Sequence, residues 1–568
     1  MTESTRQRIP HHLQRYVVSQ NYQRYTPEDQ AVWRFVMRQL KTFLSQTAHD
    51  SYLNGLKMTG LNVEEIPRIE VIDAHLEKFG WGALPVSGFI PPAAFMEFQS
   101  LGLLPIASDM RTAEHLTYTP APDIVHEAAG HAPFLAHPEY AAYLKQYGEV
   151  ARNSIISKQD LDQYEAIRVL SDVKEDPSST VQDIRSAEEN LNRVNASMTV
   201  VSEAALLSRM NWWTAEYGLI GDLKAPKIFG AGLLSSVGES AACLRPEVRK
   251  IPLSVDCVNF TYDITEPQPQ LFVTRDFSQL GEVLEKLADQ LAYRRGGVYG
   301  LNRAIEAESV NTVQLDTGLQ IAGILKDFIA DTQGQPIYLR FQGPCQLATD
   351  RRELPNQGTS RHEHGFSMPL GKPKPGSKTL SDLKAGQRAL FEFESGVKVN
   401  GVVSTFTHHQ GKPVLVTWTD CKVTLGDEVL FDPSWGEYDM AVGFAVESVF
   451  AGPAHRSRYG QTEDFMAKQV PQRVISNEVR SRHQTFQAIR DLRHAGVDLP
   501  RLHELVNGFL MNPSINWLQG VELLELSYQF NASSEQYRLL AVLKPENYPH
   551  GSVRQSVSDG IELAKLKN

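Results

Sequence analysis

The hydrophobic periodicity of the chain changes near residue 310, and this change limits the folds open to it. From about residue 93 to 245, apolar residues recur at helical spacing. Past 310 they alternate with polar residues, in RALFEFESGVKVNGVVSTF and KPVLVTWTDCKVTL, and the HHQG stretch between these runs predicts a hairpin. Helical spacing returns from about 463. We therefore expect a mainly α domain, then a β-rich domain, then a helical C-terminal region.

The 568 residues exceed the size of one ordinary domain. We expect an N-terminal arm over 1–30, a first domain over 31–305, a β-rich domain of unknown role over 310–460 and a helical region over 463–568. A charged segment at about 154–197 predicts a helical insertion in the first domain.

Local signals refine this division. Thr26 and Pro27 suit the N-cap and first position of a helix, and apolar residues at helical spacing follow over 31–44. The segment 350–381, rich in Pro, Gly, Lys and Arg, predicts a long loop or linker.

Composition excludes several classes of protein. A net charge of -11 argues against a nucleic-acid or anionic-membrane surface. The four cysteines lie far apart without a CxxC pair, so neither a disulfide framework nor a zinc knuckle is indicated. The polar N-terminus lacks the apolar run of a secretory signal, and no stretch has the length of a membrane span. We expect a cytoplasmic protein.

The most informative short motif is HEAAGH at residues 126–131. It resembles the zinc-protease motif HExxH, but its histidines lie five residues apart rather than four. On a regular α-helix this step turns the two imidazoles about 140° apart. Gly130 and Pro133 give reasons for the helix to end or distort there, which would let both histidines reach one metal.

Glu216 is the best candidate for a third ligand. It lies in NWWTAEYGL, where an isolated carboxylate among aromatics must be paired or metal-bound. Two histidines and one carboxylate leave three positions open on an octahedral ion, an arrangement typical of Fe(II) oxygen chemistry. From these residues alone, core or capping histidines and a buried salt bridge for Glu216 remain alternatives.

Ordered sequence blocks resemble the catalytic domain of the pterin-dependent aromatic amino acid hydroxylases, in particular its bacterial members. The blocks occur over about residues 25–300, at 86–90 with Phe95, Arg111, 118–123, 126–131, 212–219, 229–239 and 262–269. The resemblance implies a mainly α catalytic domain of this type over 31–305. The interval between His131 and Glu216 is longer than is usual in the family, because of the insertion at 154–197.

The resemblance implies a role for each matching residue. His126, His131 and Glu216 match the iron ligands, and no catalytic residue beyond the metal site is implied. The positions that match the pterin site are Gly88, Ile90, Phe95 and Glu127. The positions that match the amino acid site are Arg111, Thr119, Pro122, Asp123, Trp212, Gly232 and Ser235. Arg111 would bind the substrate carboxylate with its planar fork, and Asp123 would hold Arg111 in place.

The implied activity is hydroxylation of an aromatic amino acid ring with Fe(II), O₂ and a tetrahydropterin, either tetrahydrobiopterin or a bacterial equivalent. Phenylalanine is the expected substrate, with tyrosine and tryptophan as alternatives. A metallohydrolase that uses the same ligands with Glu127 as base is a second alternative, and a non-catalytic scaffold is a third. We expect no nucleic-acid or membrane partner, and the C-terminal half could support a homo-oligomer.

Overall fold

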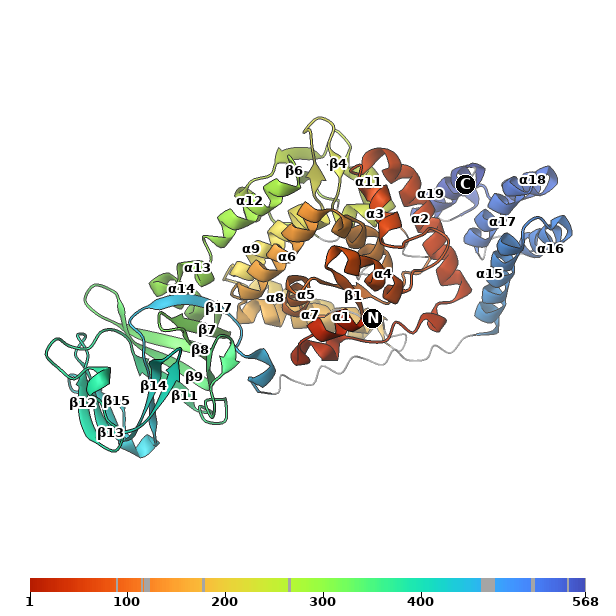
Figure 1. Cartoon of the computed structure of the whole chain (residues 1–568). Helices are drawn as coiled ribbons and strands as arrows, with labels where there is room; N and C mark the ends of the chain where they lie inside the picture. Colours follow the sequence, from red (N-terminus) through yellow and green to blue (C-terminus); the bar gives the residue numbers. More distant parts are fainter. Residues whose placement is uncertain are drawn as a thin grey trace. The chain divides into compact units, whose positions relative to one another are not determined.

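The computed structural model describes residues 1–87, 90–113, 116, 123–175, 179–263, 267–460, 476–511, 516–548 and 551–566 (Figure 1). The chain forms two compact units. The first contains residues 1–148, 209–283 and 466–568, and the second contains 149–208 and 284–465. Each unit is described by itself.

Helix α2 (Pro27–Thr47) is the longest helix of the first unit's N-terminal part, and it begins where the sequence predicts. Thr26 is its N-cap: the Thr26 hydroxyl accepts a hydrogen bond from the Asp29 N–H, and the Asp29 carboxylate accepts one from the Thr26 N–H. This reciprocal capping box satisfies two backbone donors that helix geometry leaves free. Pro27 occupies the first turn, where its missing N–H costs nothing.

The rest of the first unit, apart from the C-terminal helices, consists mainly of short helices and two small sheets. Its N-terminal part also holds α1 (Glu3–Arg8), η1 (His11–Tyr16), η2 (Tyr22–Arg24), α3 (Tyr52–Met58), α4 (Ile69–Leu76), η3 (Glu77–Phe79), α5 (Pro92–Ser100), η4 (His126–His131) and η5 (Ala132–Ala136). Its middle part holds η6 (Trp212–Glu216), α10 (Ala231–Leu234), α11 (Val237–Cys243) and η7 (Val255–Asn259). Three of the four division points between the units fall inside α6 (Pro138–Asn153), α9 (Glu203–Asn211) and α12 (Phe277–Ala288), and the fourth, between 465 and 466, lies outside the described residues.

The two sheets of the first unit set the positions of the loops and helices between them. One is a parallel pair, β1 (Gly82–Val86) with β2 (Leu103–Ala107). The other has the order β4-β3-β6-β5 and is formed by β3 (Leu219–Ile220), β4 (Lys227–Ile228), β5 (Arg249–Pro252) and β6 (Gln270–Thr274). Every residue of β1 and β2 is buried, as expected for a parallel sheet that is covered on both faces.

The C-terminal helices also belong to the first unit. They are α15 (Asn477–Ala495), α16 (Leu499–Leu510), α17 (Trp517–Gln529), α18 (Ser533–Val542), η11 (Pro545–Asn547) and α19 (Ser552–Lys565). Every residue of α17 from Trp517 to Ser527 is buried. A helix buried all round its axis is a core element and not a peripheral appendage.

The second unit contains a helical pair and a β-rich region. The helices α7 (Lys158–Glu175) and α8 (Val181–Ser197) occupy the segment of the predicted insertion. Residues 176–178, between the two helices, lie outside the described residues. The short helices α13 (Ala292–Arg295) and α14 (Gly297–Ala307) lead into the strands.

Two antiparallel sheets make up the β-rich region. The first has the order β10-β9-β8-β7-β17, with β11 paired to β9, and the second has the order β12-β13-β14-β15, with β16 paired to β14. Their strands are β7 (Val310–Leu315), β8 (Leu319–Ala330), β9 (Pro336–Thr349), β10 (Arg352–Glu353), β11 (Gly365–Pro369), β12 (Arg388–Glu392), β13 (Val397–His409), β14 (Lys412–Leu425), β15 (Glu428–Phe431), β16 (Tyr438–Ala441) and β17 (Val446–Ala451). The three-part fold class expected from periodicity is thereby confirmed.

The predicted hairpin is the β13–β14 pair. His409 pairs with Lys412 across a two-residue turn in which Gln410 and Gly411 have φ of 49° and 77°. Positive φ at both central residues is the signature of a type I′ turn, whose twist matches that of the strands.

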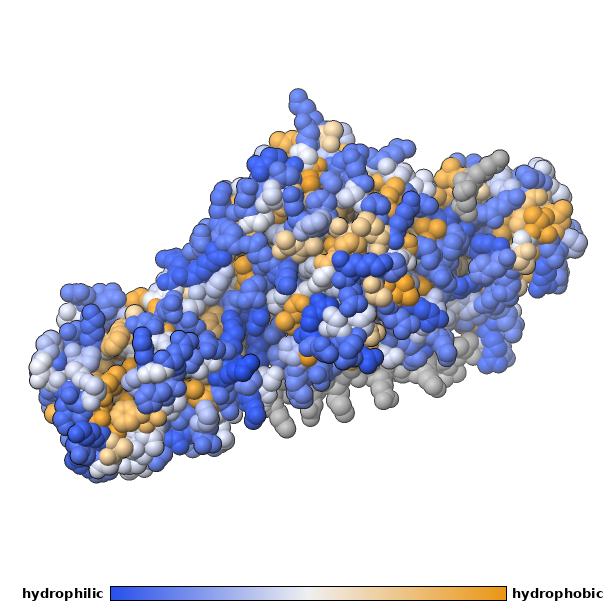
Figure 2. All heavy atoms as spheres, in the orientation of Figure 1, coloured by the Kyte–Doolittle hydropathy of each residue, from blue (hydrophilic) through white to orange (hydrophobic). Residues whose placement is uncertain are grey.

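The molecular surface drawn in Figure 2 is mostly hydrophilic, with scattered apolar residues. None of the helices in the described parts of the chain combines the length and apolar composition needed to cross a bilayer.

Candidate metal centre

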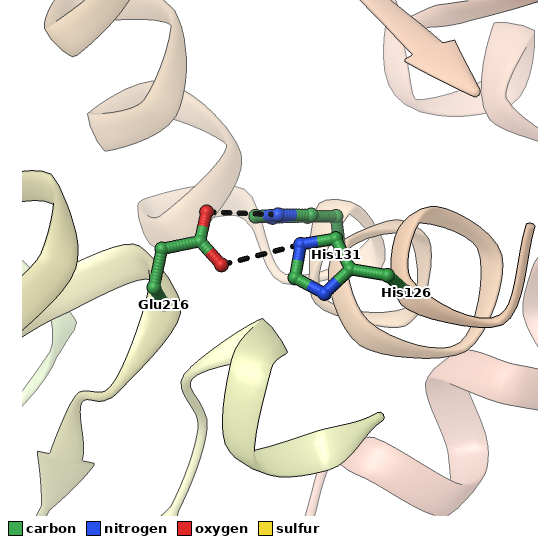
Figure 3. A group of neighbouring side chains, drawn as sticks. All are labelled: His126, His131 and Glu216. Carbon is green, nitrogen blue, oxygen red and sulfur yellow. Dashed lines mark ion pairs between the residues drawn. The ribbon is translucent and has the colours of Figure 1, made fainter. Parts of the chain in front are cut away.

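Within the described ranges, one group of three metal-binding side chains meets, formed by His126, His131 and Glu216 (Figure 3). One potential ligand atom from each lies within 4.8 Å of the others. Glu216 Oε2 is 3.3 Å from His126 Nε2, and Glu216 Oε1 is 3.2 Å from His131 Nε2. The imidazole rings are 5.1 Å apart between centroids and meet at 80°. Three donors converging on one point from two segments of the chain have the composition of a 2-His-1-carboxylate site.

A π-helix solves the spacing problem of the two histidines. The segment η4 is π-helical, and the N–H of Ala132 donates to the carbonyl of Glu127, five residues earlier. Hydrogen bonds between residues five apart widen the helix, so that residue i+5 returns to the face of residue i. The five-residue step that excludes HExxH thus places both imidazoles on one side. The distortion expected near Gly130 is therefore confirmed, and it is a π-helix.

Gly130 permits the close approach of η4 to the next segment of the site. A Cβ at residue 130 would lie 2.7 Å from the carbonyl oxygen of Ala231 and 2.9 Å from the Ala231 Cβ. These distances are too short for an unshifted structure. A glycine is required because η4 and α10 pack backbone to backbone.

Glu216 comes from a second π-helical segment, η6. The N–H of Tyr217 donates to the carbonyl of Trp212 at 2.8 Å, which closes the five-residue turn. Strand β3 follows directly and pairs with β4 and β6. The chain then returns through Gly230, whose N–H donates to the Gly218 carbonyl at 3.0 Å, into α10. The small sheet therefore fixes Glu216 and α10 relative to one another.

The electrostatics of the cluster favour an ionised Glu216. Burial acts to raise the pKa of this carboxyl, but the two facing imidazoles lower it well below its ordinary value. Burial acts to lower the pKa of His126, but the Glu216 carboxylate raises it to about 9. A carboxylate held between two imidazole nitrogens has the charge that a divalent cation requires. The donor set and its burial therefore fit a metal ion.

Ser235 orients His126 from behind. His126 Nδ1 is 3.0 Å from Ser235 Oγ, which itself donates to the Ala231 carbonyl at 2.8 Å. Because the Ser235 hydrogen is directed at Ala231, the Nδ1–H of His126 must be the donor to Ser235. This leaves Nε2, the ring nitrogen that faces Glu216, as the atom that would bind a metal ion in place of its proton.

Arg111 and Asp123 form a buried, two-point ion pair beside this site. Arg111 Nε and Nη2 donate to the two carboxylate oxygens of Asp123 at 2.7 and 2.8 Å, and Arg111 Nη1 donates to the Ser235 carbonyl at 3.1 Å. Burial acts to raise the pKa of Asp123, but Arg111 lowers it below its ordinary value. Asp123 Oδ1 also accepts the His126 N–H at 3.2 Å. Arg111 is thus tied to the metal-binding segment twice, through Asp123 and through Ser235.

The described residues predicted for the pterin site lie on three segments. Ile90 is buried after β1, and Phe95 is half-buried on α5. Glu127 is 4% exposed, and its Oε2 lies 4.0 Å from His131 Nε2. Burial raises the pKa of Glu127. Gly88 lies outside the described residues, as do Thr119 and Pro122 of the predicted amino acid site.

Trp212 and Gly232, both predicted for the amino acid site, are joined through Tyr217. The Trp212 ring stacks between Tyr217 at 4.4 Å and Tyr262 at 4.3 Å. A Cβ at Gly232 would lie 2.8 Å from the Tyr217 ring. The absence of a side chain at residue 232 therefore makes room for this aromatic stack.

Two tyrosines that support the π-helices were missed from the sequence. The Tyr52 hydroxyl donates to the carbonyl of Ala129 at 2.9 Å, inside η4. The Tyr143 hydroxyl lies 2.8 Å from the Thr214 hydroxyl, inside η6. Both tyrosines are buried. In sequence they read as ordinary core aromatics, and only their hydroxyl contacts in space reveal their support of the site.

Comparison with known proteins agrees with this geometry. The sequence profile of the biopterin-dependent aromatic amino acid hydroxylases matches residues 4–164 and 186–318, more than half of the chain. The chain belongs to this family. The match extends further toward the N-terminus than the resemblance noted above, and its gap at 165–185 falls within the α7–α8 pair.

Individual relatives match about half of the chain. A phenylalanine-4-hydroxylase from Mesorhizobium japonicum is 28% identical over 274 residues, which are 48% of this chain and 83% of that protein. One from Vibrio cholerae is 26% identical over 262 residues, 46% of this chain and 75% of that protein. A solved structure of phenylalanine hydroxylase from Chromobacterium violaceum, with iron(III) and 7,8-dihydrobiopterin, is 25% identical, covers 51% of this chain and 93% of its own, and has a TM-score of 0.39.

Proposed function

We propose that this chain hydroxylates the ring of phenylalanine to give tyrosine, with Fe(II), a tetrahydropterin and O₂. The observation that carries the proposal is the hydrogen-bonded path from the metal-binding atoms to a buried guanidinium, through His126, Ser235 and Arg111. A metal site and a carboxylate-binding group held at a constant separation suit an amino acid whose side chain reacts beside the metal. Phenylalanine is proposed because the relatives from M. japonicum and V. cholerae are phenylalanine-4-hydroxylases.

We propose that Arg111 binds the substrate carboxylate. A guanidinium has five N–H groups, and described residues engage three of those of Arg111. One N–H on each terminal nitrogen remains, and two parallel N–H groups match the two oxygens of a carboxylate. Asp123 neutralises Arg111 and fixes its plane before substrate arrives. The preorganised fork then loses little side-chain entropy on binding.

His126, His131 and Glu216 would hold the iron, because two imidazoles and one carboxylate are the ligands that non-haem Fe(II) oxygenases use. Bound iron and pterin would together supply the activation of O₂ that no protein side chain can perform. Phe95, half-buried on α5, would stack on the pterin, with Gly88, Ile90 and Glu127 beside it. Trp212, Gly232, Thr119 and Pro122 would line the amino acid pocket and exclude water from the reacting ring.

The test is a product assay in competition. The full-length protein, loaded anaerobically with Fe(II), receives tetrahydrobiopterin, ¹⁸O₂ and equal amounts of phenylalanine, tyrosine and tryptophan, and ¹⁸O-labelled products are identified by mass spectrometry. We expect pterin-dependent tyrosine as the main product. If tryptophan or tyrosine were hydroxylated instead, the substrate assignment would be wrong, and absence of every hydroxylated product would overturn the activity itself.

A pair of histidine variants isolates the metal site in the same assay. His126→Ala is expected to lose iron and all activity, because one ligand atom is removed. His494→Ala is the control, since His494 is an exposed histidine on α15. Iron content is measured by elemental analysis after anaerobic desalting. Full iron retention by His126→Ala would contradict the ligand assignment.

A further inference from the structure

The N-terminal segment 1–25 lies along the parallel β1–β2 pair from one end to the other. At the start of the pair, Arg8 Nη1 donates to the carbonyl of Gly102 at 3.1 Å. At its end, Val17 forms an antiparallel bridge with Val86, and the Val18 N–H donates to the Pro85 carbonyl at 3.0 Å. The segment therefore contacts the strand pair both where it begins and where it ends.

These contacts fall where the proposed ligand-binding loops begin. Strand β1 ends at Val86, immediately before the segment that contains Gly88 and Ile90. Strand β2 ends at Ala107, and the chain from Ser108 leads to Arg111. Parallel strands present their carboxyl ends at the same edge, and Val86 and Ala107 accordingly form the last pair of β1 and β2. The position of each loop depends on how firmly these strand ends are held.

Ser108 joins the two strand ends. The Ser108 N–H and hydroxyl both donate to the carbonyl of Val86, at 3.0 and 3.2 Å. The next residue, Asp109, accepts the Ile124 N–H at 2.9 Å, and Ile124 adjoins Asp123 of the Arg111 ion pair. Ser108 therefore lies between the loop proposed for the pterin and the residues proposed for the amino acid carboxylate.

Tyr25 holds Ser108 from the N-terminal segment. The Tyr25 hydroxyl donates to the Ser108 carbonyl at 2.6 Å. The same hydroxyl accepts a bond from Gln20 Nε2 at 3.3 Å, and Gln20 in turn bonds the backbone of Pro67 and Ile69. Two hydrogen bonds thus hold the Tyr25 hydroxyl in place, and the side chain does not rotate freely.

A second contact reaches the helix that carries Phe95. His12 Nε2 lies 3.1 Å from Glu97 Oε2, and Glu97 is 4% exposed on α5, two residues after Phe95. The N-terminal segment therefore contacts β1, which precedes Gly88 and Ile90 in the chain, and α5, which carries Phe95.

We propose that Tyr25 is a positioning residue, which holds the end of β1 and Arg111 at their working separation through Ser108. The inference rests on the proposed function, because it takes the roles of 88–90, Phe95 and Arg111 from it. Ser108 bonds the last residue of β1 and lies three residues before Arg111, so one hydrogen bond at Ser108 restricts both. Misplacement of a binding group by a fraction of an ångström weakens a preorganised site without removing any ligand contact.

The chain offers a matched control one turn away. Tyr22 is also half-buried, lies edge-to-face against Tyr25 at 5.4 Å, and donates its hydroxyl to the Ile66 carbonyl at 2.7 Å. Tyr22→Phe removes an equivalent hydrogen bond from the same segment, but one that does not reach β1 or β2. The two variants therefore separate a general loosening of the segment from a specific loss at Ser108.

The experiment compares full-length wild type, Tyr25→Phe and Tyr22→Phe, all loaded with Fe(II). Binding of tetrahydrobiopterin is measured by anaerobic calorimetry, and KM and kcat for phenylalanine are measured separately. For Tyr25→Phe we expect the pterin Kd and the phenylalanine KM to rise about three- to tenfold, as loss of one hydrogen bond implies. The kcat at saturation and the Fe(II) affinity should stay within about twofold of wild type.

For Tyr22→Phe we expect a change in melting temperature similar to that of Tyr25→Phe, but an unchanged pterin Kd. Wild-type constants for Tyr25→Phe would overturn the inference, and so would equal effects of both variants on pterin binding. If wild-type protein bound no tetrahydrobiopterin, the proposed function itself would fail. That outcome is distinguishable, because it does not depend on either variant.

Discussion

Ser235 makes more contacts with the site's residues than its position in the sequence predicts. Its hydroxyl accepts the Nδ1–H of His126, and its carbonyl accepts an N–H of Arg111. The resemblance implied only that Ser235 lines the amino acid pocket. In the structure it joins the metal-binding atoms to the guanidinium, a contact of side chain and backbone that no spacing along the chain could reveal.

The substitution Arg111→Lys tests the carboxylate-binding proposal and keeps a cation beside Asp123. Arg111→Ala would leave Asp123 buried and unpaired, which costs about 3–5 kcal/mol and confuses folding with binding. Arg111→Lys keeps the charge and loses the planar fork. We expect the phenylalanine KM to rise about ten- to a hundredfold, the effect of about 1.5–3 kcal/mol from a charged hydrogen bond.

The measurement for Arg111→Lys is steady-state kinetics with iron content determined on the same sample. Iron content should be unchanged, because no ligand atom is altered. Arg185→Lys, an exposed arginine on α8, is the control for the exchange itself. A wild-type phenylalanine KM in Arg111→Lys would show that the carboxylate binds elsewhere.

At the scale of the element, both ligand-bearing segments are π-helical. Such segments are rare and are found mostly at functional sites, because one widened turn is less stable than an α-helical one. Tyr52 and Tyr143 compensate in part, since their hydroxyls contact Ala129 and Thr214 within these turns. The two π-helices are what make a five-residue histidine step compatible with one metal.

Gly130→Ala tests the packing that holds η4 in place. The added Cβ would meet the Ala231 carbonyl at 2.7 Å, so η4 and α10 must separate. We expect a loss of about 1–3 kcal/mol in unfolding free energy from overpacking. Fe(II) affinity should fall about ten- to a hundredfold, because His126 then moves relative to Ser235 and Glu216. Anaerobic metal titration and urea unfolding measure the two effects.

Gly238→Ala is the matched control for Gly130→Ala. Gly238 lies in α11, and an added Cβ there meets no atom within 4 Å. Alanine should therefore stabilise this helix by up to about 1 kcal/mol and leave Fe(II) affinity unchanged. Equal Fe(II) affinities for Gly130→Ala and wild type would contradict the packing argument.

One segment was predicted wrongly. The segment 350–381 was expected to be a loop or linker, but β10 and β11 lie within it, and both pair antiparallel with β9. Phe366 and Met368 point into the core on alternate positions. Two apolar residues are too short a pattern to outweigh the surrounding Pro, Gly and Lys, so the strand is specified by its partner β9 rather than by its own sequence.

At the scale of the molecule, the C-terminal helices are part of the catalytic unit's core. Arg34 of α2 pairs with Glu64 at 2.6 Å, with Glu522 at 3.0 Å and with both oxygens of Glu525. Burial acts to raise the pKa of Glu525, but Arg34 lowers it below its ordinary value. The ring of Phe35 meets Trp517 edge-to-face at 5.2 Å beside this network. A role of the C-terminal half in a homo-oligomer stays a prediction.

Removal of the central arginine tests this organisation. Arg34→Met leaves buried carboxylates without their main partner, so we expect a loss of about 3–5 kcal/mol from the free energy of unfolding of this unit. Arg490→Met is the control, because Arg490 pairs with the exposed Glu65 at 3.4 Å in the same region. An exposed pair contributes less than about 1 kcal/mol.

Urea unfolding, followed by hydrogen exchange of peptides from α2 and α17, measures both variants in the full-length protein. We expect Arg34→Met to unprotect both helices together, because the network joins them. Equal stabilities of Arg34→Met and Arg490→Met would refute the central role of this network in the unit.

What the sequence alone determined was the class of each region and the identity of the ligands. Periodicity is a local property, so the helices, the β13–β14 hairpin and the Thr26 cap could all be predicted from neighbouring residues. The five-residue step excluded a protease helix, and the ordered blocks indicated the family. Tertiary structure alone decided how His126 and His131 reach one metal, which tyrosines support them, and that Ser235 links them to Arg111. These features depend on contacts between residues far apart in the chain, where packing and hydrogen bonding outweigh local preference.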